Sequence, residues 1–271
     1  TTSVQTLDPE SNQDLPLSVD QRFPKPARGW RGVSCMIRTI GHFVRQDRRL
    51  GEAVVIPGDV RADASSERTH VLSQEVDETY TLHLREQAKK EKTTVHCALS
   101  AAICLTMAEV IGGGEPVSIK HRSPINIRRD LEPPVGDEIG LFASILFFRD
   151  RLAGKENFWE VARAIQAQHE EQRRKLMPLA SLRLTSLLYR AVGGKKRTGH
   201  ELGEAWRTKS PGTCGLTNIG IVDLPKYSGP FTVEGLHFAV STASLVNFTS
   251  TAATYDGLLT WNFLCPFRVF E

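Results

Sequence analysis

The residues best suited to chemistry in this sequence lie where two predicted strands end. Asn126 and Arg128 alternate with isoleucines just before a proline-rich turn. Thr217, Asn218 and Gly220 end another strand. An arginine at a strand end is often held by structural hydrogen bonds, although it can also line a cleft. Small polar residues followed by glycine permit either a bend or the close approach of a ligand. On the residues alone, both interpretations of each segment stay open.

The common catalytic and metal-binding patterns are missing from the sequence. There is no Gly-x-Ser-x-Gly turn for a serine nucleophile. His96 and Cys97 are neighbours on a predicted helix, so their side chains diverge by about 100° and we expect core packing rather than a pair. No two histidines have the His-x-x-x-His spacing, and the five cysteines form no Cys-x-x-Cys pair. We therefore assign neither a catalytic residue nor a metal site to this chain.

Two glycine-containing segments have an ordinary and a functional interpretation. Gly112-Gly113-Gly114 lacks the Lys-Ser/Thr of a phosphate loop and follows a predicted helix, so we expect a helix stop. Lys195, Lys196 and Arg197 form a basic loop after two glycines. Such a loop is usually solvated, but it could also contact the phosphates of a nucleotide-bearing cofactor.

Length and composition limit the class of protein. With 271 residues, of which 40% are hydrophobic, the chain can bury a sizeable core, which excludes a disordered tail. The 34 basic and 31 acidic residues leave a net charge of +3, too small to indicate a nucleic-acid partner. Apolar stretches are shorter than the roughly 20 residues of a transmembrane helix, so we expect no membrane span.

The cysteines and the first residues suggest where and how the chain occurs. Five scattered cysteines are an odd number, so we expect reduced core residues and a cytoplasmic location. The chain opens on Thr1 without an initiator methionine and without a signal peptide, so we expect a fragment or a processed piece.

Patterning predicts an α/β protein with a mixed sheet. Residues 1–31 are polar and rich in proline, which is typical of a linker, and residues 32–271 would form the folded domain. The segment Gly140 to Phe148 is apolar on both faces, which is typical of a strand inside a doubly covered sheet. We expect helices over 32–50, 77–90, 94–110, 155–175 and 176–191, and strands over 68–76, 116–122, 140–148, 215–221, 231–240, 251–255 and 258–264, the last two joined at Asp256-Gly257.

Several of these segments together resemble a known family. The order of the motifs is similar to that in the C-terminal half of the chloramphenicol-acetyltransferase-like superfamily. The branch in question contains nonribosomal-peptide condensation domains, alcohol acetyltransferases and polyketide-associated acyltransferases. The matching segments are Arg68 to Val76, Asp77 to Lys90, Thr93 to Ala102, Pro124 to Arg128, Glu138 to Phe142, Thr217 to Gly220 and Thr254 to Leu258.

The resemblance implies an acyltransferase made of two αβ halves with a tunnel between them, of which this chain would be one half. The co-substrate would be an acyl-coenzyme A or a phosphopantetheine thioester rather than a permanently bound cofactor, and a small-molecule alcohol or amine would accept the acyl group. The family's base is a histidine in a His-His-x-x-x-Asp-Gly motif of the N-terminal half, and this chain contains no His-His pair. The base would therefore belong to a complementary half. Thr217, Asn218 and Gly220 would line the tunnel, and Asn126 and Arg128 would support the active centre.

Two functions follow as alternatives. The chain is either the C-terminal part of an acyltransferase or a noncatalytic half-domain that binds a partner or a thioester ligand without turnover. A large uncovered apolar face would favour the first, because a second half would then cover it.

Overall fold

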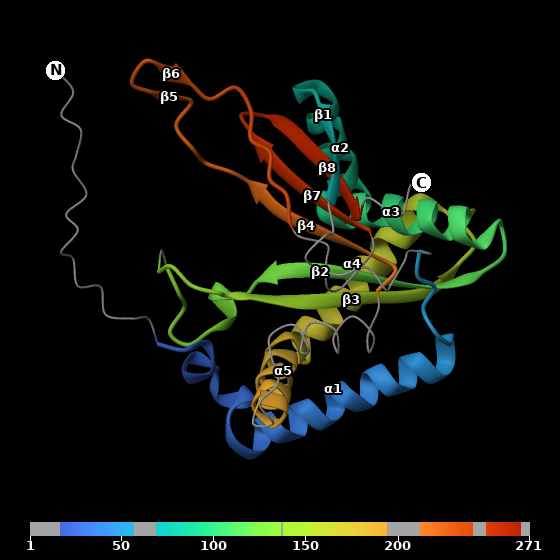
Figure 1. Cartoon of the computed structure of the whole chain (residues 1–271), viewed down its shortest axis with the longest axis vertical. Coiled ribbons are helices and arrows are strands. Elements are labelled where there is room, and N and C mark those ends of the chain that lie inside the picture. Colours follow the sequence, from blue (N-terminus) through green and yellow to red (C-terminus); the bar gives the residue numbers. More distant parts are fainter. Residues whose placement is uncertain (1–16, 57–68, 137, 194–211, 241–247, 267–271) are drawn as a thin grey trace.

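The computed structural model describes residues 17–56, 69–136, 138–193, 212–240 and 248–266. Within them, five α-helices accompany a six-stranded mixed sheet with the order β1-β8-β7-β4-β2-β3 (Figure 1). The helices are α1 (Gly29–Leu50), α2 (Glu78–Lys90), α3 (Val95–Gly112), α4 (Phe158–Arg174) and α5 (Met177–Gly193). The strands are β1 (Thr69–Val76), β2 (Val117–Asn126), β3 (Ala143–Leu152), β4 (Cys214–Ile221), β7 (Thr249–Tyr255) and β8 (Leu258–Pro266), with a small separate hairpin of β5 (Tyr227–Ser228) and β6 (Phe231–Thr232).

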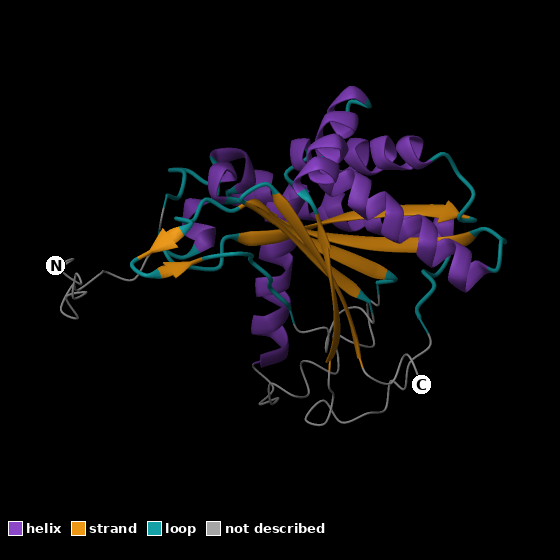
Figure 2. Cartoon of the chain, turned by 90° about the horizontal axis from the view of Figure 1, so that it is seen from above, coloured by secondary structure: helices purple, strands orange, loops and turns teal. Residues whose placement is uncertain are grey.

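The sheet combines both strand directions, as the sequence predicted. β4 pairs in parallel with β2 and β7, and the remaining neighbours are antiparallel. Figure 1 shows β2 and β3 crossing the direction of β7 and β8, which is the twist of the sheet. Most of the helices gather on one side of the sheet (Figure 2). The fold is thus the mixed αβ class that patterning indicated.

The main core lies between the sheet and helices α3 and α4. Ile119, Phe148 and Leu216 from three neighbouring strands meet Ile165 of α4 and Cys104 of α3, all fully buried. Burying each large apolar side chain contributes about 1.5–3 kcal/mol. Among the described helices, α3 alone has the length and hydropathy of a transmembrane helix, and half of it is buried inside the protein. Its apolar character on all sides is thus that of the predicted core helix.

Local signals in the sequence set most of the helix boundaries. The Asp77 side chain accepts a hydrogen bond from Tyr80 N at the start of α2, and Thr94 accepts from Cys97 N at the start of α3. Gly113 ends α3 in the left-handed conformation (φ 58°), as expected of a glycine helix stop. Asp256 and Gly257 have positive φ between β7 and β8, so the predicted hairpin is confirmed.

One strand prediction was wrong in position. Gly140 to Phe148 was expected inside the sheet, whereas β3 begins at Ala143 and is an edge strand. The side-chain amide of Gln172 donates to and accepts from the backbone of Phe147, and Gln168 does the same at Arg149. Helix α4 thereby satisfies the free edge, which would otherwise expose unpaired backbone groups. Both faces of the strand are covered, which explains its apolar pattern without a central position.

The predicted linker over residues 1–31 is corrected for the part that the structure describes. Residues 19–22 and 25–27 form 3₁₀ turns, and Phe23 and Ala27 are 3% and 4% exposed in a second core cluster with Leu179. Arg22 forms an ion pair with Glu138 (2.8 Å). A search for helical or strand periodicity misses this packing. Single buried side chains in short turns do not recur at a regular spacing.

Among the other strands, the regions of β6 and β2 differ most in length from the prediction. The strand expected over 231–240 is only the two-residue β6, and the following backbone instead accepts side-chain hydrogen bonds from the sheet. Thr251 and Asn262 both donate to the carbonyl of Phe238, and Thr260 donates to that of Leu236. β2 continues four residues beyond the predicted end at Arg122.

Candidate functional site

The end of β4 carries the first candidate segment. Asn218 Oδ1 accepts a hydrogen bond from Gly220 N (2.8 Å), and the register against β7 shifts between these two residues, so the strand bulges there. Gly220 has a φ of 78°, and a Cβ placed on it would have no neighbour within 4 Å. Thr217, Asn218 and Gly220 are half-buried rather than packed under α3. The bend that we considered at Gly220 is therefore present. The Asn218 side chain accepts a hydrogen bond from the backbone of Gly220 there, rather than capping the loop at Asp223.

Asn126 and Arg128 lie together at the end of β2. Asn126 Oδ1 accepts from Arg128 N (2.9 Å), and the Arg128 guanidinium donates to the carbonyl of Gly136 (2.5 Å). The guanidinium also lies 4.6 Å from the centre of the Phe142 ring. These contacts fasten the proline-rich turn to the strand end, which is the structural interpretation of this arginine.

Replacing Arg128 with alanine should destabilise the chain. The variant loses a hydrogen bond and a cation–π contact, together worth about 1–2 kcal/mol. Urea unfolding of Arg128→Ala measures the loss, and Arg129→Ala, at an exposed neighbouring position, is the matched control. An Arg128→Ala variant as stable as the Arg129→Ala control would show an ordinary surface arginine.

A buried polar cluster was missed by the sequence analysis. Ser123 Oγ lies 3.0 Å from His96 Nε2 and 3.3 Å from His121 Nδ1, and the rings of His96 and His169 are 6.0 Å apart between centres. His96 comes from α3, His121 and Ser123 from β2, and His169 from α4. Only His96 drew attention in the sequence, because the others are separated from it by 25 to 73 positions. Their contact depends on the packing of three elements, which no local spacing encodes.

Burial keeps these histidines neutral. Desolvation lowers the pKa of His96 to about 4. It lowers the pKa of His169 to about 3, with smaller contributions from His96 and Arg173. The pKa of the fully buried His121 also lies well below its ordinary value, for the same first cause and then because of His96 and His169. The lowered pKa values make each imidazole a weak base, and His121 and His169 are also closed off from solvent, at 0% and 7% exposure.

Another histidine is held at both ring nitrogens. His237 Nδ1 lies 3.2 Å from Asn262 Oδ1, and Nε2 lies 3.0 Å from Glu75 Oε1. Both partners place an oxygen atom against a ring nitrogen. Such a histidine links β1 to β8 and the backbone beyond β6, and it offers no free nitrogen for base catalysis.

The predicted phosphate-binding residues and the pocket are separate from the groups of residues described above. Lys195, Lys196 and Arg197 lie outside the described residues. A pocket of about 420 Å³ lies near the start of α1, lined by Phe23, Arg28, Leu141 and Leu187 among others. It contains none of the predicted site residues. The structure therefore brings Thr217, Asn218 and Gly220 together at one strand end and Asn126 with Arg128 at another.

A comparison with protein families finds one match over most of the chain. Residues 65–258 match the family described as phthiocerol/phthiodiolone dimycocerosyl transferase C-terminus. No curated protein matches the sequence.

Solved structures share the fold at low sequence identity. They include the trichothecene 15-O-acetyltransferase TRI3 from Fusarium sporotrichioides, with a TM-score of 0.66, 11% identity, and coverage of 92% of this chain and 51% of that one. Polyketide synthase associated protein 5 from Mycobacterium tuberculosis gives a TM-score of 0.55 and 15% identity over 89% of this chain and 57% of that one. The EpoB cyclization-docking bidomain from Sorangium cellulosum gives a TM-score of 0.54 and 16% identity over 90% of this chain and 45% of that one. The chain spans about half the length of these structures.

Proposed function

Because the chain belongs to the phthiocerol/phthiodiolone dimycocerosyl transferase C-terminus family, an acyltransferase family, we propose that it forms the C-terminal half of an acyltransferase. An N-terminal half would complete the enzyme. The donor would be an acyl-coenzyme A or a phosphopantetheine thioester, and the acceptor a small alcohol or amine.

The proposed reaction requires one base and one open path. A histidine of the N-terminal half takes the proton from the acceptor oxygen or nitrogen, which attacks the thioester carbonyl. The new ester or amide bond forms, the carbon–sulfur bond breaks, and the thiol leaves with a proton. The lowered pKa values of His96, His121 and His169, which make these imidazoles weak bases, support an origin of the base outside this chain. This chain's part would be to shape one wall of the tunnel.

An exposed apolar rim is the observation that carries the proposal. Apolar side chains follow one another from the end of β4 to β6 and are largely exposed, with Ile221, Tyr227 and Phe231 at 68%, 70% and 74%. The β5–β6 hairpin projects away from the sheet (Figure 1). Exposed apolar patches of this kind mark interaction surfaces. We define this rim as Ile219, Ile221, Leu224, Tyr227 and Phe231.

Association with the N-terminal half tests the proposal. We expect the chain to bind a separately produced N-terminal half, and the double variant Tyr227→Ser/Phe231→Ser to bind at least roughly tenfold more weakly, because each buried aromatic contributes about 1.5–3 kcal/mol. Surface plasmon resonance measures the affinities. The control is Trp30→Ser, which removes an aromatic residue 87% exposed on α1, far from the hairpin. Absence of binding, or equal affinity of the double variant and the control, would contradict the proposed rim.

The tunnel wall would lie at the end of β4, beside the rim. Asn218 already uses its carbonyl oxygen at Gly220 N, so its amide nitrogen is the group it would offer to a carbonyl of a pantetheine arm. Thr217 and Gly220 would stand beside it along the arm. A phosphate contact of Lys195, Lys196 and Arg197 at the far end of a coenzyme A donor belongs to the same proposal.

Gly220→Val should reduce acyl transfer by the reconstituted pair. A side chain at this position points into open space, so the core is spared, while the positive φ costs about 1–2 kcal/mol for any other residue. Gly220→Ala also places a side chain at positive φ, with less bulk and without β-branching, and is therefore the nearest control, with Tm measured for both variants. We expect kcat/KM to fall at least roughly tenfold further in the valine variant than in the alanine variant, which corresponds to about 1.4 kcal/mol. Equal values would remove Gly220 from the tunnel.

A further inference from the structure

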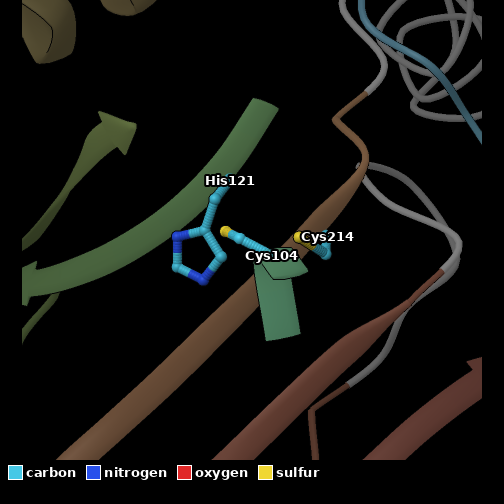
Figure 3. A group of neighbouring side chains, drawn as sticks. All are labelled: Cys104, His121 and Cys214. Carbon is cyan, nitrogen blue, oxygen red and sulfur yellow. The ribbon is translucent and has the colours of Figure 1, made fainter. Parts of the chain in front are cut away.

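Two buried cysteines and a buried histidine meet in the core, and no part of the proposed acyl transfer uses them. Cys104 belongs to α3, His121 to β2 and Cys214 to the start of β4. One potential ligand atom of each lies within 4.8 Å of those of the other two. Figure 3 shows the three side chains converging from these separate elements. All three residues have 0% exposure.

The fold itself builds this cluster. His121 and Cys214 are register partners in the parallel pairing of β2 and β4, so their side chains stand beside each other on the same face of the sheet. Helix α3 packs on that face and brings Cys104 against them. The residues are separated by 17 and 93 positions, which explains why no spacing motif marks them in the sequence.

One ring nitrogen of His121, Nε2, has no hydrogen-bond partner among the described residues. Ser123 Oγ can accept a hydrogen bond from His121 Nδ1 and donate its own proton to His96 Nε2, at 3.3 Å and 3.0 Å. This arrangement puts the hydrogen of the His121 ring on Nδ1 and leaves the lone pair on Nε2. Nε2 is also buried. An unsatisfied buried nitrogen costs about 1–3 kcal/mol, so a group that bound at Nε2 would remove this cost.

We propose that Cys104, Cys214 and His121 bind a zinc ion. Two sulfurs and one imidazole nitrogen are the donor set that favours Zn²⁺. Two thiolates would neutralise the charge of the ion, so the buried site would carry no net charge. Zinc prefers four ligands, so these three side chains would leave one position for a further ligand. Binding displaces one proton from each thiol and changes no oxidation state.

Metal content and spectroscopy of the reduced 271-residue chain test the site. After incubation with ZnSO₄ and gel filtration, we expect about one zinc per chain by mass spectrometry, and with CoCl₂ the absorption bands of thiolate-to-cobalt charge transfer. Cys104→Ser and Cys214→Ser should each lose the metal and these bands. Cys35→Ser removes another buried cysteine, on α1 and away from the cluster, and should keep both.

Thermal unfolding gives a second measurement. Chelator should lower the Tm of the wild type and of Cys35→Ser by roughly 5 °C or more, because zinc binds only the folded chain. It should leave the Tm of the cysteine variants unchanged. If those variants do not fold, the cobalt spectrum of the wild type decides. A wild type that takes up no zinc, shows no thiolate band, or contains a Cys104–Cys214 disulfide in place of the metal would overturn the proposal, as would zinc retained in both variants.

Discussion

Acidification from pH 7 to about 4.5 should remove several kcal/mol from the free energy of unfolding, measured with a chelator present. His96 and His169 have folded-state pKa values of about 4 and about 3, both below the ordinary 6.5. The unfolded chain therefore binds more protons than the folded chain once the pH falls below 6.5. Their stabilising contribution is complete above pH 6.5 and is lost as the pH falls toward the folded-state values. By pH 4.5 this loss is roughly 2–3 kcal/mol for each histidine.

Urea unfolding across this pH range measures the effect. His169→Gln removes one titrating group, so the free energy of unfolding should fall less steeply with decreasing pH, whatever its value at pH 7. His83→Gln is the matched control, because it makes the same substitution at an exposed histidine on α2, outside the cluster. The same slope in wild type and His169→Gln would show that the buried cluster does not set the acid sensitivity.

The purified chain alone should show no acyl transfer above background. The proposed base belongs to the N-terminal half, and its absence alone should cost at least about 10²-fold in rate. Without the second half the thioester also lacks a tunnel that positions it, which removes a further and larger factor. Release of free thiol from acetyl-coenzyme A with an added alcohol, followed by a thiol reagent, checks this expectation. Turnover by the chain alone would mean that one of its own residues is the base.

Local chemistry made much of the fold predictable. Asp77, Thr94 and Gly113 bound two helices through caps that act over three or four residues, and Asp256-Gly257 fixes a two-residue hairpin. The order of these elements was enough to indicate the mixed αβ class. The same approach failed for residues 231–240. Side chains of β7 and β8 donate hydrogen bonds to the backbone of this segment, which does not form strand pairing beyond β6.

Features that depend on distant partners were not predictable. β3 appeared to be a central strand because its two faces are apolar, and only the packing of Gln168 and Gln172 shows how an edge strand can be covered. The contacts of His121 with Ser123, Cys104 and Cys214 arise from the pairing of β2 with β4 and from α3 above them. Thr217, Asn218 and Gly220 could be named from one strand end, but the bulge between Asn218 and Gly220 needed the register with β7.

Product formation by the two halves together tests the central claim most directly. The chain, the N-terminal half and their mixture are each incubated with a panel of acyl-coenzyme A and carrier-bound thioester donors and with alcohol or amine acceptors. Esters or amides are detected by mass spectrometry. The account predicts product from the mixture only, and loss of product when the first two residues of the His-His motif in the N-terminal half are replaced by alanine. A mixture that associates but forms no product with any donor, including carrier-bound thioesters, would contradict the acyltransferase and favour a noncatalytic binding half.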